Sequence, residues 1–139
     1  MKNNFCLSLI GKNSEDIEFI SSLFQDAIIY NADIEFDFKK HIFYLVANRF
    51  CWEKKNKKNE IYRVITGLKI FNANSVKTIG FYKNKKQFLN LLTINLEKNK
   101  KNINFVFSKN INIKVNVKKI EVIVRDFSSP HPSFSIPKH

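Results

Sequence analysis

The sequence predicts an α+β domain: an N-terminal strand and helix, then a mostly antiparallel β-sheet, then a short C-terminal helix. First, the spacing of apolar residues changes from about 3.6 in residues 14–26 to 2 in residues 34–38. Second, several apolar runs follow one another with only short Lys- and Asn-rich connections, as in hairpins. Third, 139 residues of 44% hydrophobic composition are enough for one packed core. We expect about seven to eight strands, with a barrel-like closure of the sheet as one option.

The first elements are a strand at residues 5–10 and a helix at residues 14–26. Asn13 or Ser14 can cap the free amide groups at the start of the helix, and two acids in its first turn complement the helix dipole. The apolar side chains of the helix lie three and four positions apart on one stripe: Ile17, Ile20, Leu23, Phe24 and Ala27. This stripe predicts the face that packs against the sheet.

Strands are predicted from residue 34 onwards. Ile34, Phe36 and Phe38 alternate with acids, which predicts one apolar and one solvated face. Residues 41–52 are apolar on both faces, as in a central strand covered on both sides, and residues 61–71 are its expected antiparallel partner. Further strands are expected at residues 74–81, 88–97, 103–108 and 111–117.

Residues 118–127 fit two structures. Their β-branched residues favour a strand. In contrast, four apolar residues have the spacing of one helical face: Ile120, Ile123, Val124 and Phe127. Glu121 and Arg125 also lie four positions apart, which suits an ion pair on a helix, so we favour the helix. The predicted domain spans residues 1–127, and residues 128–139, with all three prolines, form an extended tail.

The formal net charge of +12 is unevenly distributed. Residues 1–38 carry seven acids and two lysines, whereas the rest of the chain is strongly basic. Lysine outnumbers arginine by 21 to 3, a bias that drift in an AT-rich genome produces without a polyanionic partner. Drift alone does not predict the polarity, and a protein with an acidic end and a basic remainder can dock on an anion.

The sequence predicts no catalytic, cofactor or metal site. Cys6 and Cys51 lack metal-ligand spacing, and His41 is too far from Cys51 along one strand to share an ion with it. Neither a Gly-x-Ser-x-Gly elbow nor a glycine-rich phosphate loop is present. No apolar run is long enough to span a bilayer, so we expect a cytoplasmic protein without membrane insertion.

The stretch around the only tryptophan is the best candidate for a recognition surface. The candidate residues are Asn48, Arg49, Trp52, Glu53 and Arg63. In one interpretation Arg49 and Glu53 form a structural ion pair on one strand face, with Phe50 and Trp52 in the core. In the other, Arg49 binds an anion or carboxylate and Trp52 supplies a contact plane.

Lysine-rich loops beside aromatic residues leave a second kind of partner open. Phosphates bind cations and bases stack on exposed rings, so such loops can bind a nucleic acid. The candidate polyanion contacts are Lys54, Lys55, Lys57, Lys58, Lys83, Lys85 and Lys86. They lie near Trp52 and Tyr62 in the first loop and near Phe81 and Tyr82 in the second. Lysine-rich loops also keep a β protein soluble, which is the alternative reading.

Several motifs together resemble those of the domain of unknown function 2948 family. They are "LFQDAI", "VANRFCWE", "TGLKI", "LLTINLE", "VRDF" and the final "PKH", in the family's order and spacing over essentially the whole chain. The residues that match family positions are Gln25, Asp26, Asn48, Arg49, Phe50, Trp52, Glu53, Gly67, Leu68, Asp126, Pro137 and His139. Cys51 and Lys138 depart from the family pattern. The resemblance implies a cytoplasmic bacterial protein, mostly found in alphaproteobacteria, and brings no activity with it.

These observations favour a non-enzymatic domain that acts through contacts with an unknown protein partner. The alternative is a protein that binds RNA or single-stranded nucleic acid through its lysine-rich loops. An exposed edge strand would also allow a dimer.

Overall fold

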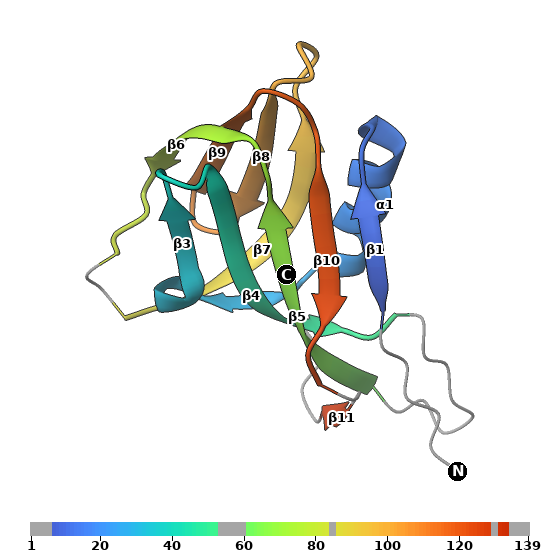
Figure 1. Cartoon of the computed structure of the whole chain (residues 1–139). Helices are drawn as coiled ribbons and strands as arrows, with labels where there is room; N and C mark the ends of the chain where they lie inside the picture. Colours follow the sequence, from blue (N-terminus) through green and yellow to red (C-terminus); the bar gives the residue numbers. More distant parts are fainter. Residues whose placement is uncertain (1–6, 53–60, 84–85, 129–130, 134–139) are drawn as a thin grey trace.

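The computed structural model describes residues 7–52, 61–83, 86–128 and 131–133 (Figure 1). The elements in these ranges are, in chain order, β1 (Ser8–Gly11), α1 (Ser14–Phe24), β2 (Ile28–Tyr30), a 3-10 turn η1 (Asn31–Asp33), β3 (Ile34–Asp37), β4 (Ile42–Phe50), β5 (Ile61–Ile70), β6 (Ala73–Ile79), β7 (Phe88–Leu96), β8 (Asn102–Phe107), β9 (Ile111–Val117), β10 (Val122–Asp126) and β11 (His131–Ser133).

The strands form one antiparallel sheet in the order β1-β10-β5-β4-β2-β7-β8-β9-β6. β3 also pairs with β4, and β11 pairs with β5. The sheet curves strongly, so that β6 to β9 lie opposite β4, β5 and β10 (Figure 1). Its end strands β1 and β6 do not pair with each other among the described residues, so the expected barrel-like closure is wrong. The expected seven to eight strands are also too few, because the described sheet has eleven.

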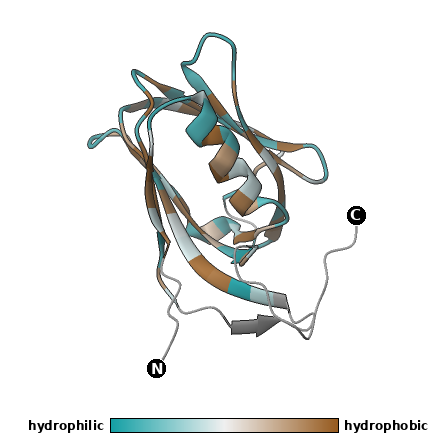
Figure 2. Cartoon of the chain, turned by 90° about the vertical axis from the view of Figure 1, so that its right-hand side faces the viewer, coloured by the Kyte–Doolittle hydropathy of each residue, from teal (hydrophilic) through white to brown (hydrophobic). Residues whose placement is uncertain are grey.

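Helix α1 lies inside the curve of the sheet, between its two sides (Figure 2). The expected cap is Asn13, whose side chain accepts a hydrogen bond from the amide of Asp16 at 2.9 Å. The predicted apolar stripe is confirmed, because all five of its residues are buried: Ile17, Ile20, Leu23, Phe24 and Ala27. They join the inner side chains of the sheet in one core.

The expected C-terminal helix is wrong, and with it the α+β class: the described chain is mostly β, with α1 as its one α-helix. Residues 122–126 form β10, which pairs with β1 on one side and β5 on the other. A strand fits because Val122, Val124 and Asp126 alternate as buried residues, whereas Ile123 and Arg125 face outward. Hydrogen bonds to two neighbouring strands outweigh the helical spacing, which is present but weak over so short a segment.

The antiparallel pairing of β4 with β5 is confirmed, with Phe43 opposite Ile70 and Phe50 opposite Arg63. The expectation that β4 is covered on both faces is wrong. Inner residues such as Leu45 are buried, but the outer face carries Tyr44, which is 38% exposed. The outer face of β4, β5 and β10 is therefore an apolar sheet surface that no described helix covers (Figure 1).

Candidate protein-docking face

Arg49 of the predicted recognition cluster points into the protein. Strand alternation on β4 places it on the inner face, where it is 0% exposed. Its Nη2 atom lies 3.1 and 3.2 Å from the two carboxylate oxygens of Asp126 on β10. Its Nε atom donates to Thr66 Oγ1 on β5 at 2.9 Å, and its Nη1 atom donates to the carbonyl of Phe50 at 3.1 Å. The guanidinium therefore joins three neighbouring strands.

Asp126 completes this buried network. Its carboxylate accepts hydrogen bonds from Thr66 Oγ1 at 2.7 Å and from the amide of Leu7 at 2.9 Å, in addition to the Arg49 ion pair. The amide of Asp126 in turn donates to the carbonyl of Leu7. The network thus holds the chain before β1 against β10, β5 and β4. From the sequence, Arg49 was paired with Glu53 or with an outside anion and was not connected with Asp126, because a contact between residues 77 positions apart leaves no local pattern.

Asn48, Phe50, Trp52 and Arg63 lie together on the other side of the same strands. The Arg63 guanidinium carbon lies 4.0 Å above the centre of the Phe50 ring, and the Trp52 ring centre is 5.1 Å from that of Phe50. Arg63 Nη1 also donates to the Asn48 carbonyl at 3.0 Å. Burial lowers the pKa of the Arg63 guanidinium, and the charge of Asp26 opposes that shift. Arg63 is therefore engaged within the protein, while Trp52 is 49% exposed.

The remaining sequence candidates fall into two groups. Glu53, Lys54, Lys55, Lys57, Lys58 and Lys85 lie outside the described residues. Lys83 donates to Glu35 Oε1 at 3.0 Å and to the carbonyl of Ile34, so its ammonium group is bound to the start of β3. Lys86 is exposed. The connection that contains Lys83 and the lysine-rich hairpin between β7 and β8 lie on different sides of the molecule (Figure 1). These two described lysine clusters do not form one patch.

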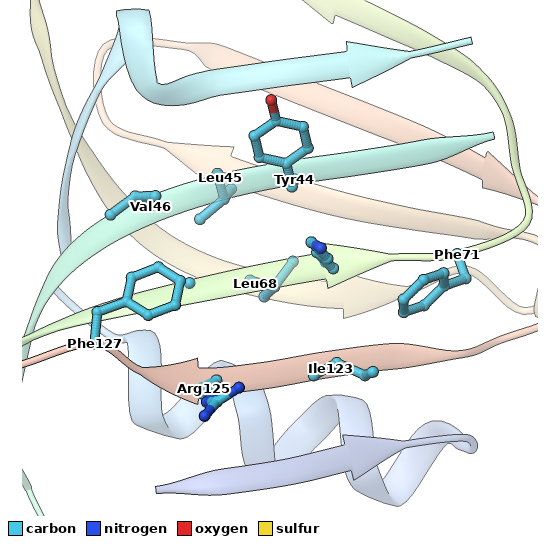
Figure 3. Close-up of a pocket in the computed structure, with 10 residues that line it drawn as sticks. Tyr44, Leu45, Val46, Leu68, Phe71, Ile123, Arg125 and Phe127 are labelled. Atoms are coloured by element: carbon cyan, nitrogen blue, oxygen red, sulfur yellow. The ribbon is translucent and has the colours of Figure 1, made fainter. Parts of the chain in front are cut away.

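An apolar groove crosses the outer face of β4, β5 and β10, and sequence reasoning missed it. This outer groove has a volume of about 290 Å³. Its outward-facing residues are Tyr44, Val46, Gly67, Lys69, Phe71, Ile123, Arg125 and Phe127. In Figure 3 the rings of Phe127 and Phe71 mark its two ends, with Tyr44 along one side and Ile123 and Arg125 along the other. The sequence signal for the groove is the row of apolar residues on the outer face of β4, a pattern that also predicts a strand buried on both faces.

Gly67 forms the floor of the groove beneath the Phe127 ring. A Cβ atom added to Gly67 would lie 2.6 Å from Phe127 Cζ, so the ring occupies the space that a side chain would need. The Phe127 side chain is itself 63% exposed. The far end of the ring therefore lies over Gly67, in space that a larger residue would fill, and most of the residue is exposed to solvent. Such exposed apolar surface is typical of an interaction site when it is contiguous.

Two cations accompany the apolar residues. Lys69 of β5 pairs across the strands with Tyr44 and with Ile123, and Arg125 of β10 pairs with Gly67. Both cations face outward and are exposed. Ile123 is opposite Lys69, and Arg125 lies two positions after Ile123 on β10. The Cα atoms of Lys69 and Arg125 are therefore diagonal neighbours on adjacent strands, about 7–8 Å apart. The outer groove thus combines aromatic walls with a pair of positive charges.

The described ranges offer neither a metal-binding cluster nor a membrane-spanning helix. They contain no group of three or more His, Cys, Asp or Glu side chains arranged to hold a metal ion. None of the described helices has the length and apolar character to cross a membrane.

Comparison with known proteins agrees with the motif resemblance. The family model described as Protein of unknown function (DUF2948) matches residues 7–139. The chain belongs to this family. The match covers nearly all of the chain, including Arg49 and Asp126 of the buried network and Gly67 of the outer groove. No curated protein and no solved structure matches the chain.

Proposed function

We propose that this DUF2948 protein is a non-enzymatic docking module of the bacterial cytoplasm. Its outer groove binds an extended segment of a partner protein that carries both acidic and apolar side chains. The single observation that supports this function is the exposed aromatic groove with two cations on an uncovered sheet face. Apolar walls favour burial of a partner's side chains, whereas the cations select the sign of its charge.

The spacing of the two cations suits an extended partner. Side chains at alternate positions of a strand lie on one face about 6.6–7 Å apart. Lys69 and Arg125 are separated by a similar distance, about 7–8 Å along the diagonal of adjacent strands. Two acids at alternate positions of an extended segment can therefore meet both cations at once. Apolar side chains further along the same face of that segment can then lie against the aromatic walls of the groove.

A synthetic peptide tests this proposal. The probe is a fluorescein-labelled heptapeptide that carries two aspartates at its central alternate positions and leucine or phenylalanine at the outer alternate positions of the same face. The matched probe has lysine in place of aspartate. We expect the acidic probe to bind, measured by fluorescence anisotropy, and the lysine probe to bind at least about tenfold more weakly because like charges meet at the rim. Equal binding of the two probes, or no binding of either, refutes an acidic and apolar occupant.

Gly67→Ala probes the groove without removing a charge. The added methyl group forces the Phe127 ring to leave its place on the sheet, which we expect to weaken peptide binding about fivefold or more. Phe38→Ala is the matched control, because Phe38 is a 65% exposed phenylalanine in the turn between β3 and β4 and does not line the groove. If both variants bind the peptide as the wild type does, the outer groove is not the docking site.

A further inference from the structure

A second exposed aromatic surface lies away from the outer groove, where β2 and β7 pair. Tyr30 of β2 stands opposite Phe88 of β7, and their ring centres are 5.1 Å apart with an angle of 43° between the planes. Phe88 is 72% exposed, the highest value among the large apolar side chains of the described residues. We call Tyr30 and Phe88 the aromatic platform. An aromatic ring that is exposed to this extent can stack against the ring of a ligand.

Hydrogen bonds of the buried residue Asn31 fix the backbone around the platform. Asn31 is 1% exposed, and its side chain donates to the carbonyl of Tyr82 at 2.9 Å and accepts from the amide of Gln87 at 3.2 Å. The amide of Asn31 donates to the carbonyl of Gln87 at 3.0 Å. Gln87 before Phe88 is thus held by Asn31, Leu89 after Phe88 pairs with Ile29 of β2, and the backbone of Tyr82 joins the same assembly. A platform of this kind offers its ring without first having to be ordered.

Cations flank the aromatic platform. Lys86 precedes Phe88 by two positions and is exposed. Lys109 is an exposed residue of the turn between β8 and β9, and this turn adjoins β7 because Ser108 donates its amide proton to the carbonyl of Asn90 at 2.9 Å. Lys83 is committed to β3 and Glu35, so it does not join them. The platform therefore has one cation just before β7 in the chain and another on the neighbouring β8–β9 turn.

We infer that the aromatic platform binds single-stranded nucleic acid. A base stacks on Phe88, and the phosphates on either side of it meet Lys86 and Lys109. Every base has a π-face, so this arrangement tolerates many sequences, and it needs no hydrogen bonds to base edges. The inference uses a surface distinct from the outer groove and does not rest on the proposed docking of a protein segment. It also differs from the sequence hypothesis, because it needs Phe88 and not a union of the lysine-rich loops.

Anisotropy titrations with labelled oligouridine and oligothymidine of about 12 nucleotides test the inference at about 50 mM salt. We expect binding to both oligonucleotides, because the stacking surface does not contact a 2′-hydroxyl group. Phe88→Ala should weaken both interactions about 5- to 150-fold, the range that stacking of one base supplies. Phe38→Ala truncates a similarly exposed ring in the turn between β3 and β4 and should leave the affinity unchanged. Circular dichroism melting of each variant confirms that it is folded.

Salt dependence and heparin separate stacking from simple charge attraction. Lys86→Gln and Lys109→Gln should each reduce the log-log slope of affinity against salt by about 0.7, whereas Lys40→Gln, in the turn before β4, should not. Heparin has charge but no bases, so Phe88→Ala should leave its binding unchanged. The inference is overturned if the wild type binds neither oligonucleotide, or if Phe88→Ala and Phe38→Ala weaken binding equally. It is equally overturned if Phe88→Ala changes heparin and oligonucleotide binding alike.

Discussion

The buried Arg49–Asp126 pair should make a large contribution to the stability of the fold. Asp126→Asn keeps the size of the side chain but removes the charge that faces a guanidinium with 0% exposure. The Asp126 carboxylate accepts from Thr66, Leu7 and Arg49, and an amide can present only one oxygen to these donors. Leaving buried donors unsatisfied costs about 1–3 kcal/mol each, and breaking a buried ion pair costs about 3–5 kcal/mol in total. We expect the free energy of unfolding to fall by that total.

Urea denaturation followed by Trp52 fluorescence measures this loss. With a slope of about 1.5 kcal/mol per molar urea, a loss of about 4 kcal/mol moves the midpoint by more than about 2 M. Glu35→Gln is the control, since it breaks the exposed Lys83–Glu35 pair, whose atoms are 3.0 Å apart, and should cost about 1 kcal/mol or less. An Asp126→Asn variant that is no less stable than Glu35→Gln would refute the reasoning. The double variant Arg49→Met, Asp126→Leu should lose less unfolding free energy than Arg49→Met and Asp126→Leu lose separately when their losses are added. The reason is that the double variant leaves no uncompensated buried charge.

Three further predictions concern the stability at acid pH, the cap of helix α1 and the contact between β1 and α1. Hydrogen bonds from Lys114, Asn104 and Asn102 lower the pKa of Glu97 from 4.5 to about 2, so its stabilising contribution is present above about pH 4.5 and is lost as the pH falls towards 2. Glu97→Gln should flatten the loss of stability in this window, as acid titration followed by circular dichroism will show; an unchanged curve counts against this role. Asn13→Ala should lower the unfolding free energy by about 1 kcal/mol in urea, whereas Ser14→Ala, which removes no cap bond, should cost less. Gly11→Ala would place a Cβ atom 2.9 Å from Ile20 Cδ1 and should cost about 1–3 kcal/mol. Adding Ile20→Val removes that methyl group. If the clash is the cause, the double variant should show a smaller fall in melting temperature than the sum of the falls of the two single variants.

Tyr44 and Arg49 show why the site was harder to predict than the helix. Helical periodicity is local, so the cap at Asn13 and the buried stripe followed from a few neighbouring residues. On β4, by contrast, an apolar outer face has the same sequence pattern whether a helix covers it or solvent does. Arg49 was equally ambiguous, because alternation assigns it to one face of the strand without saying which face is the inner one. Its partner Asp126 comes from β10, a strand that was predicted as a helix.

The sequence by itself determined the family, the N-terminal strand and helix, the antiparallel β4–β5 pair and the strongly basic character of the chain. These properties depend on local patterns or on composition, which a single sequence displays directly. Only the tertiary structure decided that residues 122–126 are a strand, since its hydrogen bonds come from β1 and β5 on either side. It also placed Arg49 against Asp126, opened the outer groove over Gly67, and brought Tyr30 beside Phe88. Each of these contacts joins residues that are distant in sequence. The pairing order of the strands in the curved sheet sets which residues meet, and no local pattern encodes that order.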